Sequence, residues 1–100
     1  MKNTMEKIEQ LVEQTDRVNE ATGHKIIISI PLPHRDGYAD CEVVVGKRPT
    51  RFQPWVAWLC FDGKNYAYGD YCQTYFGALE CALIKLRREM ETYRGGMNDE

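Results

Sequence analysis

The stretch that decides the fold is 54-PWVAWLCFDGKNYAYG-69. Every position from 55 to 61 is apolar, which is typical of a strand buried on both faces of a sheet. Residues 62–65 (DGKN) then predict a tight turn into a second strand, Tyr66 to Gly69. The two segments are therefore expected to form a β-hairpin, with Pro54 to Phe61 as a central strand.

The length of the hairpin turn determines which aromatic rings lie together, because a shift of one residue moves every side chain to the other face of a sheet. A two-residue loop places Tyr66 and Tyr68 on the face of Trp55. A three-residue loop places both tyrosines on the face of Trp58 instead. The sequence leaves both arrangements open.

Two helical patterns flank the strands. Residues 3–22 form an amphipathic pattern that Asn3 can cap and Gly23 can end. Residues from about 73 to 94 carry apolar side chains in alternating steps of three and four, and Gly95-Gly96 is expected to end this second helix. Its apolar stripe comprises Phe76, Leu79, Leu83, Leu86, Met90 and Tyr93.

Two further strands are expected between the first helix and the hairpin, at His24 to Leu32 and at Asp40 to Val45. The order is then a helix, three or four antiparallel strands and a helix. This order predicts an α+β fold, a two-layer sandwich with both helices on the sheet. A chain of 100 residues supports one core, so we expect a single α+β domain over residues 1–96 and a disordered tail at 97–100.

The composition argues against several classes of protein. The formal net charge is −2 and the pI is about 5.7, whereas a dedicated nucleic-acid binder usually has a basic excess. The N-terminus has no secretory signal, and no apolar run is long enough to span a membrane, so a cytoplasmic protein is expected. The four cysteines include no Cys-x-x-Cys pair; we expect reduced, mostly buried thiols and neither a metal site nor a cofactor.

Catalytic side chains are sparse. The chain has two histidines, and His34-Arg35-Asp36 lies within one loop, whereas catalytic groups normally converge from separate elements. Asp62-Gly63-Lys64 opens a hairpin and not a helix, so it is no phosphate-binding loop. The chain is therefore not expected to be an enzyme.

The aromatic side chains are concentrated. Nine of the eleven fall between Phe52 and Phe76, more than one buried face of a small domain easily accommodates. Some rings are expected at a surface that meets a partner, although rings that only fill the core remain an alternative. A homodimer through a free sheet face or edge is also left open. The partner-binding candidates are Trp55, Tyr66, Tyr68 and Tyr71, with Asp70 and Arg35 as a polar rim.

A basic loop provides the alternative site. Lys47, Arg48 and Arg51 lie close in sequence to Phe52 and Trp55, and basic side chains beside stacking rings can hold a single nucleic-acid strand. A solvated loop that carries positive charge explains the same residues without a ligand.

The order of elements resembles that of the double-stranded-RNA-binding domain. That family grips phosphates with paired lysines at the start of its second helix, where this chain has Tyr75 and Phe76, so the resemblance implies a shared shape and no shared site residues. The local match, about a third of the chain, comprises Asp62-Gly63-Lys64, Tyr66, Gly69, Thr74, Ala78, Ala82 and Leu83.

The short, mildly acidic chain with a strand-turn-strand-helix ending also resembles accessory proteins of phages and other mobile elements, such as anti-CRISPR proteins. This resemblance implies a small, non-catalytic inhibitor that occludes a host complex. The expected partner is therefore a host protein or ribonucleoprotein complex.

Overall fold

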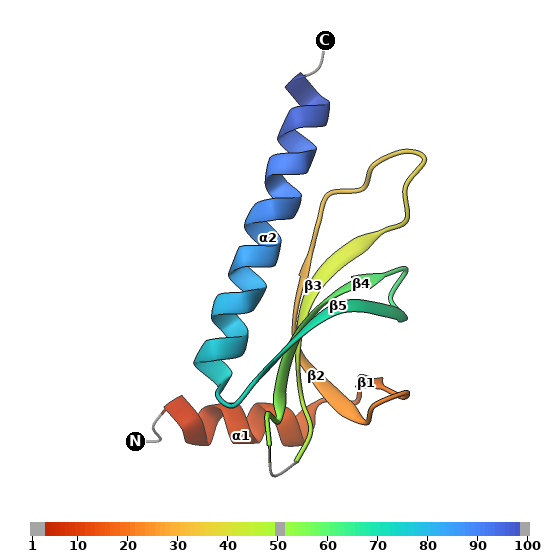
Figure 1. Cartoon of the computed structure of the whole chain (residues 1–100). Coiled ribbons are helices and arrows are strands. Elements are labelled where there is room, and N and C mark those ends of the chain that lie inside the picture. Colours follow the sequence, from red (N-terminus) through yellow and green to blue (C-terminus); the bar gives the residue numbers. More distant parts are fainter. Residues whose placement is uncertain (1–3, 50–51, 99–100) are drawn as a thin grey trace.

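A computed structural model describes residues 4–49 and 52–98, which form an α+β fold with a five-stranded antiparallel sheet (Figure 1). The strand order is β1-β2-β3-β4-β5, so each strand pairs with its neighbours in the sequence. The α+β class expected from the sequence is confirmed. The elements are α1 (Thr4–Gln14), β1 (Val18–Asn19), β2 (His24–Pro31), β3 (Cys41–Lys47), β4 (Trp55–Phe61), β5 (Asn65–Cys72) and α2 (Tyr75–Asn98).

Strands β3 and β4 are buried on both faces, as expected for the apolar run at 55–61. We call the side that α2 covers the helix face and the opposite side the far face. The helix face carries Cys41, Val43, Val45, Trp55, Ala57 and Leu59. The far face carries Ile26, Val44, Val56, Trp58 and Cys60.

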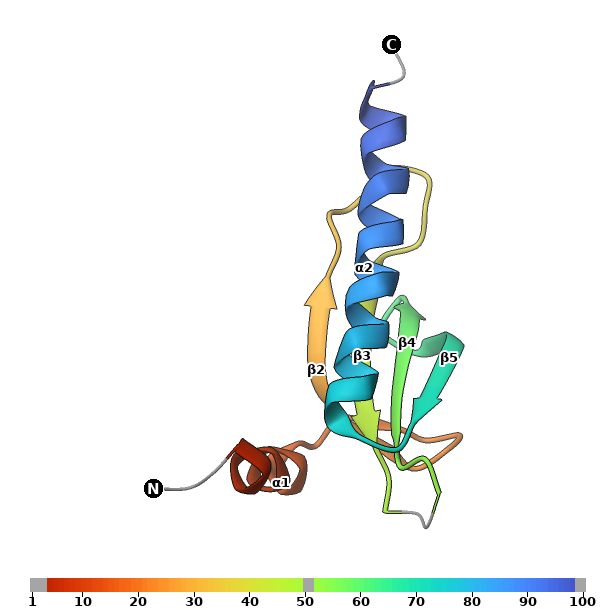
Figure 2. The ribbon, with the colours of Figure 1, turned by 60° about the vertical axis from the view of Figure 1, so that its left-hand side comes forward.

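Helix α2 lies along the helix face and packs on β3, β4 and β5 (Figure 2). Thr74 caps its start, because its hydroxyl accepts a hydrogen bond from the Gly77 N–H at 3.0 Å. Ala78 and Ala82 are fully buried, and their small side chains let the helix backbone approach the sheet closely. Hydrophobic burial at this contact is the main support of the fold.

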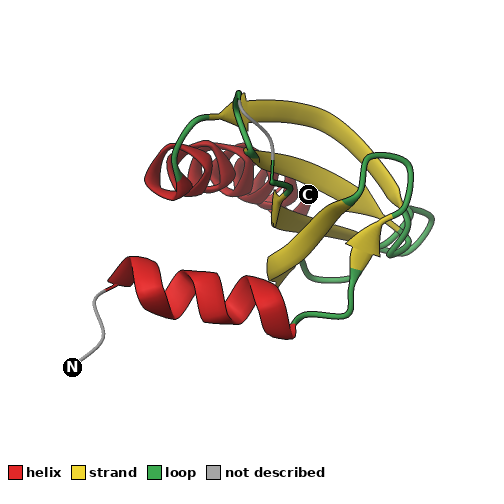
Figure 3. Cartoon of the chain, turned by 90° about the horizontal axis from the view of Figure 1, so that it is seen from below, coloured by secondary structure: helices red, strands yellow, loops and turns green. Residues whose placement is uncertain are grey.

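No helix packs on the far face within the described residues, and the chain between α1 and β2 helps to cover it. Arg17 pairs with Glu42 of β3, and its guanidinium lies 3.6 Å from the Cys60 sulfur on β4. The Thr15 hydroxyl donates to the Ile26 carbonyl at 2.8 Å. Together with the curl of the sheet, which Figure 3 shows from below, these contacts shield the second small core.

The first helix is shorter than the 3–22 pattern predicted. It ends at Gln14, and residues 18–19 form β1, because they pair with β2 and the Asn19 carbonyl accepts hydrogen bonds from two turn N–H groups. This hairpin with β2 overrides the helical pattern of the residues after Gln14. Helix α1 lies across one end of the sheet and contacts β2 (Figure 1). A layer of two helices on the sheet is not confirmed.

The second helix departs from its prediction in two respects. Residues of its apolar stripe are not all buried, since Phe76 is 59% and Leu83 53% exposed. The glycines at 95–96 do not end the helix, which continues to Asn98. Of the tail expected at 97–100, the first two residues belong to α2, and residues 99–100 lie outside the described part of the chain.

Candidate binding surface at strand β5

Strand β5 is an edge of the sheet, and a β-bulge interrupts it. Leu59 pairs with Ala67 and Ala57 pairs with Asp70, so Tyr68 and Gly69 together oppose the single residue between them on β4. Tyr68 has a φ of +56°, a conformation that a bulky non-glycine residue rarely adopts. Bulges of this kind change the direction of a side chain and occur often at sheet edges and beside functional sites.

The structure resolves the open question of the turn in an unexpected way. Phe61 pairs with Asn65, so the loop has three residues and Tyr66 lies on the far face, as that alternative predicts. Tyr68 does not share the far face with Tyr66, contrary to that alternative. The bulge turns its side chain to the helix side, where it lines a depression together with Phe61. Beyond the bulge, Tyr71 returns to the far face opposite Val56. The two faces of one edge strand thus carry different tyrosines.

Gly69 is required where the bulge passes the far face. A Cβ at this position would lie 2.7 Å from the Trp58 Nε1 atom, closer than real Cβ atoms approach other heavy atoms. The absence of a side chain at Gly69 therefore lets β5 cross a buried indole ring.

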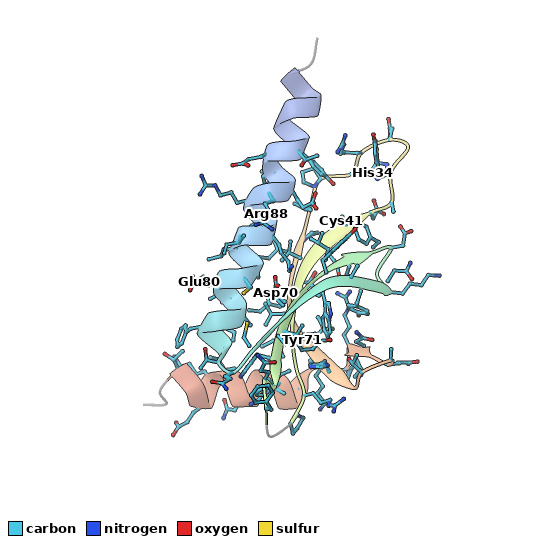
Figure 4. All side chains as sticks on the ribbon, viewed as in Figure 1. His34, Cys41, Asp70, Tyr71, Glu80 and Arg88 are labelled. Atoms are coloured by element: carbon cyan, nitrogen blue, oxygen red, sulfur yellow. The ribbon has the colours of Figure 1, made fainter. Side chains whose placement is uncertain are left out.

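The helix-side depression has a volume of about 360 Å³ and contains charges of both signs. Tyr68 stands at its edge with 72% of its surface exposed. Beneath it, the buried Lys85 ammonium of α2 pairs with the Asp70 carboxylate of β5 at 2.7 Å. Figure 4 shows Asp70 beside α2. An exposed tyrosine beside fixed charges can both stack and hydrogen-bond, so this side can bind a polar surface. The depression is lined by Leu59, Phe61, Tyr68, Lys85, Arg88 and Glu89.

Tyr66 and Tyr71 have different surroundings on the far face. Tyr66 packs edge-on against Trp58, at 5.3 Å between ring centroids, and belongs to the small far-face core. Tyr71 contacts the same indole at 6.3 Å but is exposed. Tyr66 therefore has a packing role, whereas Tyr71 offers a ring to a partner.

A second depression, of about 210 Å³, adjoins Tyr71. One wall comes from Arg48, which donates to the Thr22 carbonyl at 2.6 Å, and the exposed ring of Phe52 forms another. A cation and two exposed rings that line the same depression suit both protein and nucleic-acid partners. The depression is lined by Thr22, His24, Arg48, Phe52, Gln53 and Tyr71.

His24 forms the base of this second depression and is 4% exposed. Its Nδ1 lies 2.7 Å from the Thr22 hydroxyl, while its buried Nε2 has no hydrogen-bond partner among the described residues. Burial, and then the nearby Arg48 charge, lower the pKa of His24. The imidazole is therefore neutral at pH 7.

Two of the expected partner-binding residues are not on β5 itself, although Trp55 on β4 pairs with Cys72 of β5. Trp55 is buried on the helix face, with the Lys47 ammonium 4.9 Å from the ring centroid. Arg35, in the loop after β2, stacks on the rings of Tyr38 and Tyr93 at 4.3 Å and 4.8 Å. The structure thus gathers Tyr66, Tyr68, Asp70 and Tyr71 on one strand and leaves Trp55 and Arg35 elsewhere.

The basic-loop residues of the alternative site are also separated. Lys47 is at the Trp55 ring, on the helix face, whereas Arg48 lines the far-face depression. Arg51 lies outside the described residues. Phe52 was considered from the sequence only as a neighbour of this loop. His24 was not among the expected partner-binding residues, and its place at the start of a strand gives no signal of such a role.

Neither metal binding nor membrane spanning has structural support in the described ranges. No three His, Cys, Asp or Glu side chains converge there to hold a metal ion. Neither helix within 4–49 and 52–98 has the length and apolar character needed to cross a bilayer. Burial raises the pKa of Cys41 to about 11, and burial and the adjacent Cys81 thiol do the same for Cys72. These thiols are protonated at neutral pH.

Comparison with known proteins gives no relative from which site residues could be transferred: no family model, no curated protein and no solved structure matches this chain. The candidate surface at β5 therefore stands on its geometry alone.

Proposed function

We propose that this chain is a non-catalytic protein that binds a protein or ribonucleoprotein complex of a host through β5 and acts by occlusion, as accessory inhibitors of phages and mobile elements do. The observation that carries the proposal is Tyr68, which combines an unfavourable backbone conformation with a 72% exposed ring. Strain of this kind costs about 1 kcal/mol or more and tends to persist at functional sites.

The chemistry of the strand supports a protein partner. Tyrosine is enriched among the residues that contribute most to binding at protein interfaces. Tyr68 and Tyr71 project from opposite faces of the same edge, so a partner that surrounds this edge contacts both rings. Asp70 lies between them and supplies a charged group at the margin.

Side chains, and not added backbone pairing, are the expected means of recognition. An exposed edge strand can accept a further strand, but bulges and charged residues at an edge disfavour that pairing. Both features occur in β5, at Tyr68–Gly69 and at Asp70. The partner is therefore expected to form a pocket for the rings and not a sixth strand.

Affinity capture from the natural host, followed by mass spectrometry, tests this proposal. The immobilised wild-type chain is compared with Tyr68→Asn and Tyr71→Ser, and with Tyr38→Ser as a control in which an exposed ring is removed from the loop between β2 and β3. One stoichiometric complex that wild type and control retain and both β5 variants lose supports the proposal. Equal recovery with all four proteins, or with none, contradicts it.

The second candidate is binding of single-stranded nucleic acid at the far-face depression, and the observation that favours it is that Arg48 lines this depression together with the rings of Phe52 and Tyr71. Phosphate contacts give an affinity that decreases steeply with salt. A titration with single-stranded RNA and DNA at two salt concentrations, using wild type and Arg48→Ala, tests it. Absence of binding at low salt eliminates this candidate.

A further inference from the structure

The apolar stripe of α2 is only partly used inside the chain. The residues that pack most deeply on the sheet are Ala78, Ala82 and Lys85, all buried. Leu83 is adjacent to Ala82 and therefore points about 100° away from it. Phe76 is on the same outward side, and both side chains are more than half exposed.

The exposed side has a regular pattern. Phe76, Leu79, Leu83, Leu86 and Met90 are spaced by three, four, three and four residues, the spacing of a coiled-coil seam. Leu86 and Met90 also touch the margin of the core, so the seam is continuous with it. From Phe76 to Met90 it extends over about 21 Å of helix. This spacing is also that of a helix that packs against a second helix.

The seam lies on the side of α2 that faces away from β5. Lys85 and Cys81, on the other side of the helix, contact Asp70 and Cys72 of β5. No residue of β5 can therefore cover the seam. Leu83, Leu86 and Met90 line an open depression of about 340 Å³, with Arg87 and Glu91 at its edge.

We propose that this seam is the interface of a homodimer in which two α2 helices pack antiparallel around a twofold axis near residues 84–85. In this register Leu83 lies opposite Leu86 of the second copy, and Leu79 lies opposite Met90 of the second copy. Each layer recurs by symmetry, so the surface is complementary to itself, as a twofold interface requires.

The charged side chains at the margin of the seam favour pairing with a second copy of this chain in the antiparallel direction. Glu80 and Arg87 flank the seam on one side, and in the antiparallel register Glu80 of each copy lies beside Arg87 of the other. A parallel pair places these charges beside Tyr75 and Ala82 instead. Glu80 points away from the sheet (Figure 4), so it is available to a second molecule.

Arg87 already has one contact, an ion pair with Glu91 within the same helix at 3.3 Å. Its side chain is exposed, and exposed pairs of this kind contribute little to stability. The contact therefore does not prevent an exchange of Glu91 for Glu80 of the second copy.

The oligomeric state of the full chain tests the proposal. Sedimentation equilibrium of the wild type is expected to give a concentration-dependent dimer. Leu83→Glu is expected to raise the dissociation constant at least tenfold, since it introduces a charge into the seam of both copies. Ile84→Glu is the matched control, because Ile84 is exposed to a similar extent (45%) but lies outside the seam. Circular dichroism confirms that both variants remain folded.

Charge reversal tests the direction of the pair. Glu80→Arg and Arg87→Glu are each expected to weaken the dimer severalfold, and the double variant is expected to restore it. A monomeric wild type at about 100 μM overturns the proposal, because protein dimers of moderate strength form at that concentration. A dimer that Leu83→Glu leaves unchanged also overturns it and indicates association through the sheet. A lack of rescue in the double variant contradicts the antiparallel register.

Discussion

Tyr68 combines an unfavourable backbone conformation with an exposed side chain. Its positive φ disfavours folding, and its exposed ring gains little from the core in return. Such a residue is retained for a reason other than stability, which is the basis of the function proposed for β5.

Replacing Tyr68 with asparagine is expected to leave the protein as stable or to stabilise it by up to about 1 kcal/mol, because asparagine tolerates positive φ better than tyrosine. Urea denaturation followed by circular dichroism measures the change. Tyr66→Asn is the comparison and is expected to be destabilising, since that ring packs on Trp58. A loss of more than about 1 kcal/mol for Tyr68→Asn would show that the ring has a structural role.

His24 gives the fold a dependence on pH. Because the pKa of this buried imidazole is lowered in the folded state, the unfolded chain binds a proton more readily. Stability is therefore complete above the unfolded pKa of about 6.5 and decreases as the pH falls below it. The free energy of unfolding is expected to decrease between pH 7 and pH 5 in the wild type.

His24→Gln removes the titrating group while keeping a side chain that can hydrogen-bond Thr22. Denaturation of this variant over the same pH range is expected to show a smaller decrease than the wild type. Parallel curves for the two proteins would be inconsistent with a neutral, buried His24.

At the scale of elements, an ion pair between Lys85 and Asp70 joins α2 to β5. Lys85 is buried, and its ammonium charge is compensated by Asp70. Removing the carboxylate leaves that charge without its partner, and such a loss is costly at a buried site.

Asp70→Ala is expected to destabilise the protein by about 1–3 kcal/mol, less than for a fully buried pair because Asp70 itself is half exposed. Arg87→Ala is the matched control, since it breaks the exposed pair with Glu91 on the same helix. Its effect is expected to stay within about 0.5 kcal/mol. Thermal and urea denaturation measure both changes. Equal stability of Asp70→Ala and Arg87→Ala would contradict this account.

The elements also show what the sequence could and could not predict. Strands β2 to β5 and the second helix followed from local patterns, whereas β1 was not predicted, and the buried run at 55–61 was correctly placed inside the sheet. The end of α1 at Gln14 was missed, because Gly23, which was expected to end the helix, lies instead in the turn between β1 and β2. The turn length was left open, and it alone would not have placed Tyr68.

The position of Tyr68 could not be predicted because it is set by the bulge at Tyr68–Gly69. This bulge depends on the fit of Gly69 over Trp58, a tertiary contact that the residue spacing within β5 does not encode. Four of the six partner-binding candidates lie on β5, and their role in binding stays a prediction. The positions of Trp55 on β4 and of Arg35 in the loop after β2 depended on the packing of other elements.

At the scale of the molecule, the two proposed binding surfaces lie on different sides of the protein. The β5 edge carries Tyr68 and Tyr71, and the α2 seam lies on the side away from β5. A dimer through α2 therefore leaves both β5 edges accessible, and one assembly could engage two partner molecules. Loss of dimerisation in Leu83→Glu is expected to reduce apparent affinity for an immobilised partner without changing the affinity of a single site.

The most direct test of the central proposal is the dissociation constant of the captured partner with Tyr68→Asn, measured by calorimetry beside Tyr38→Ser. The proposal predicts at least tenfold weaker binding for Tyr68→Asn at unchanged stability, and wild-type affinity for Tyr38→Ser. Wild-type affinity in Tyr68→Asn would contradict it.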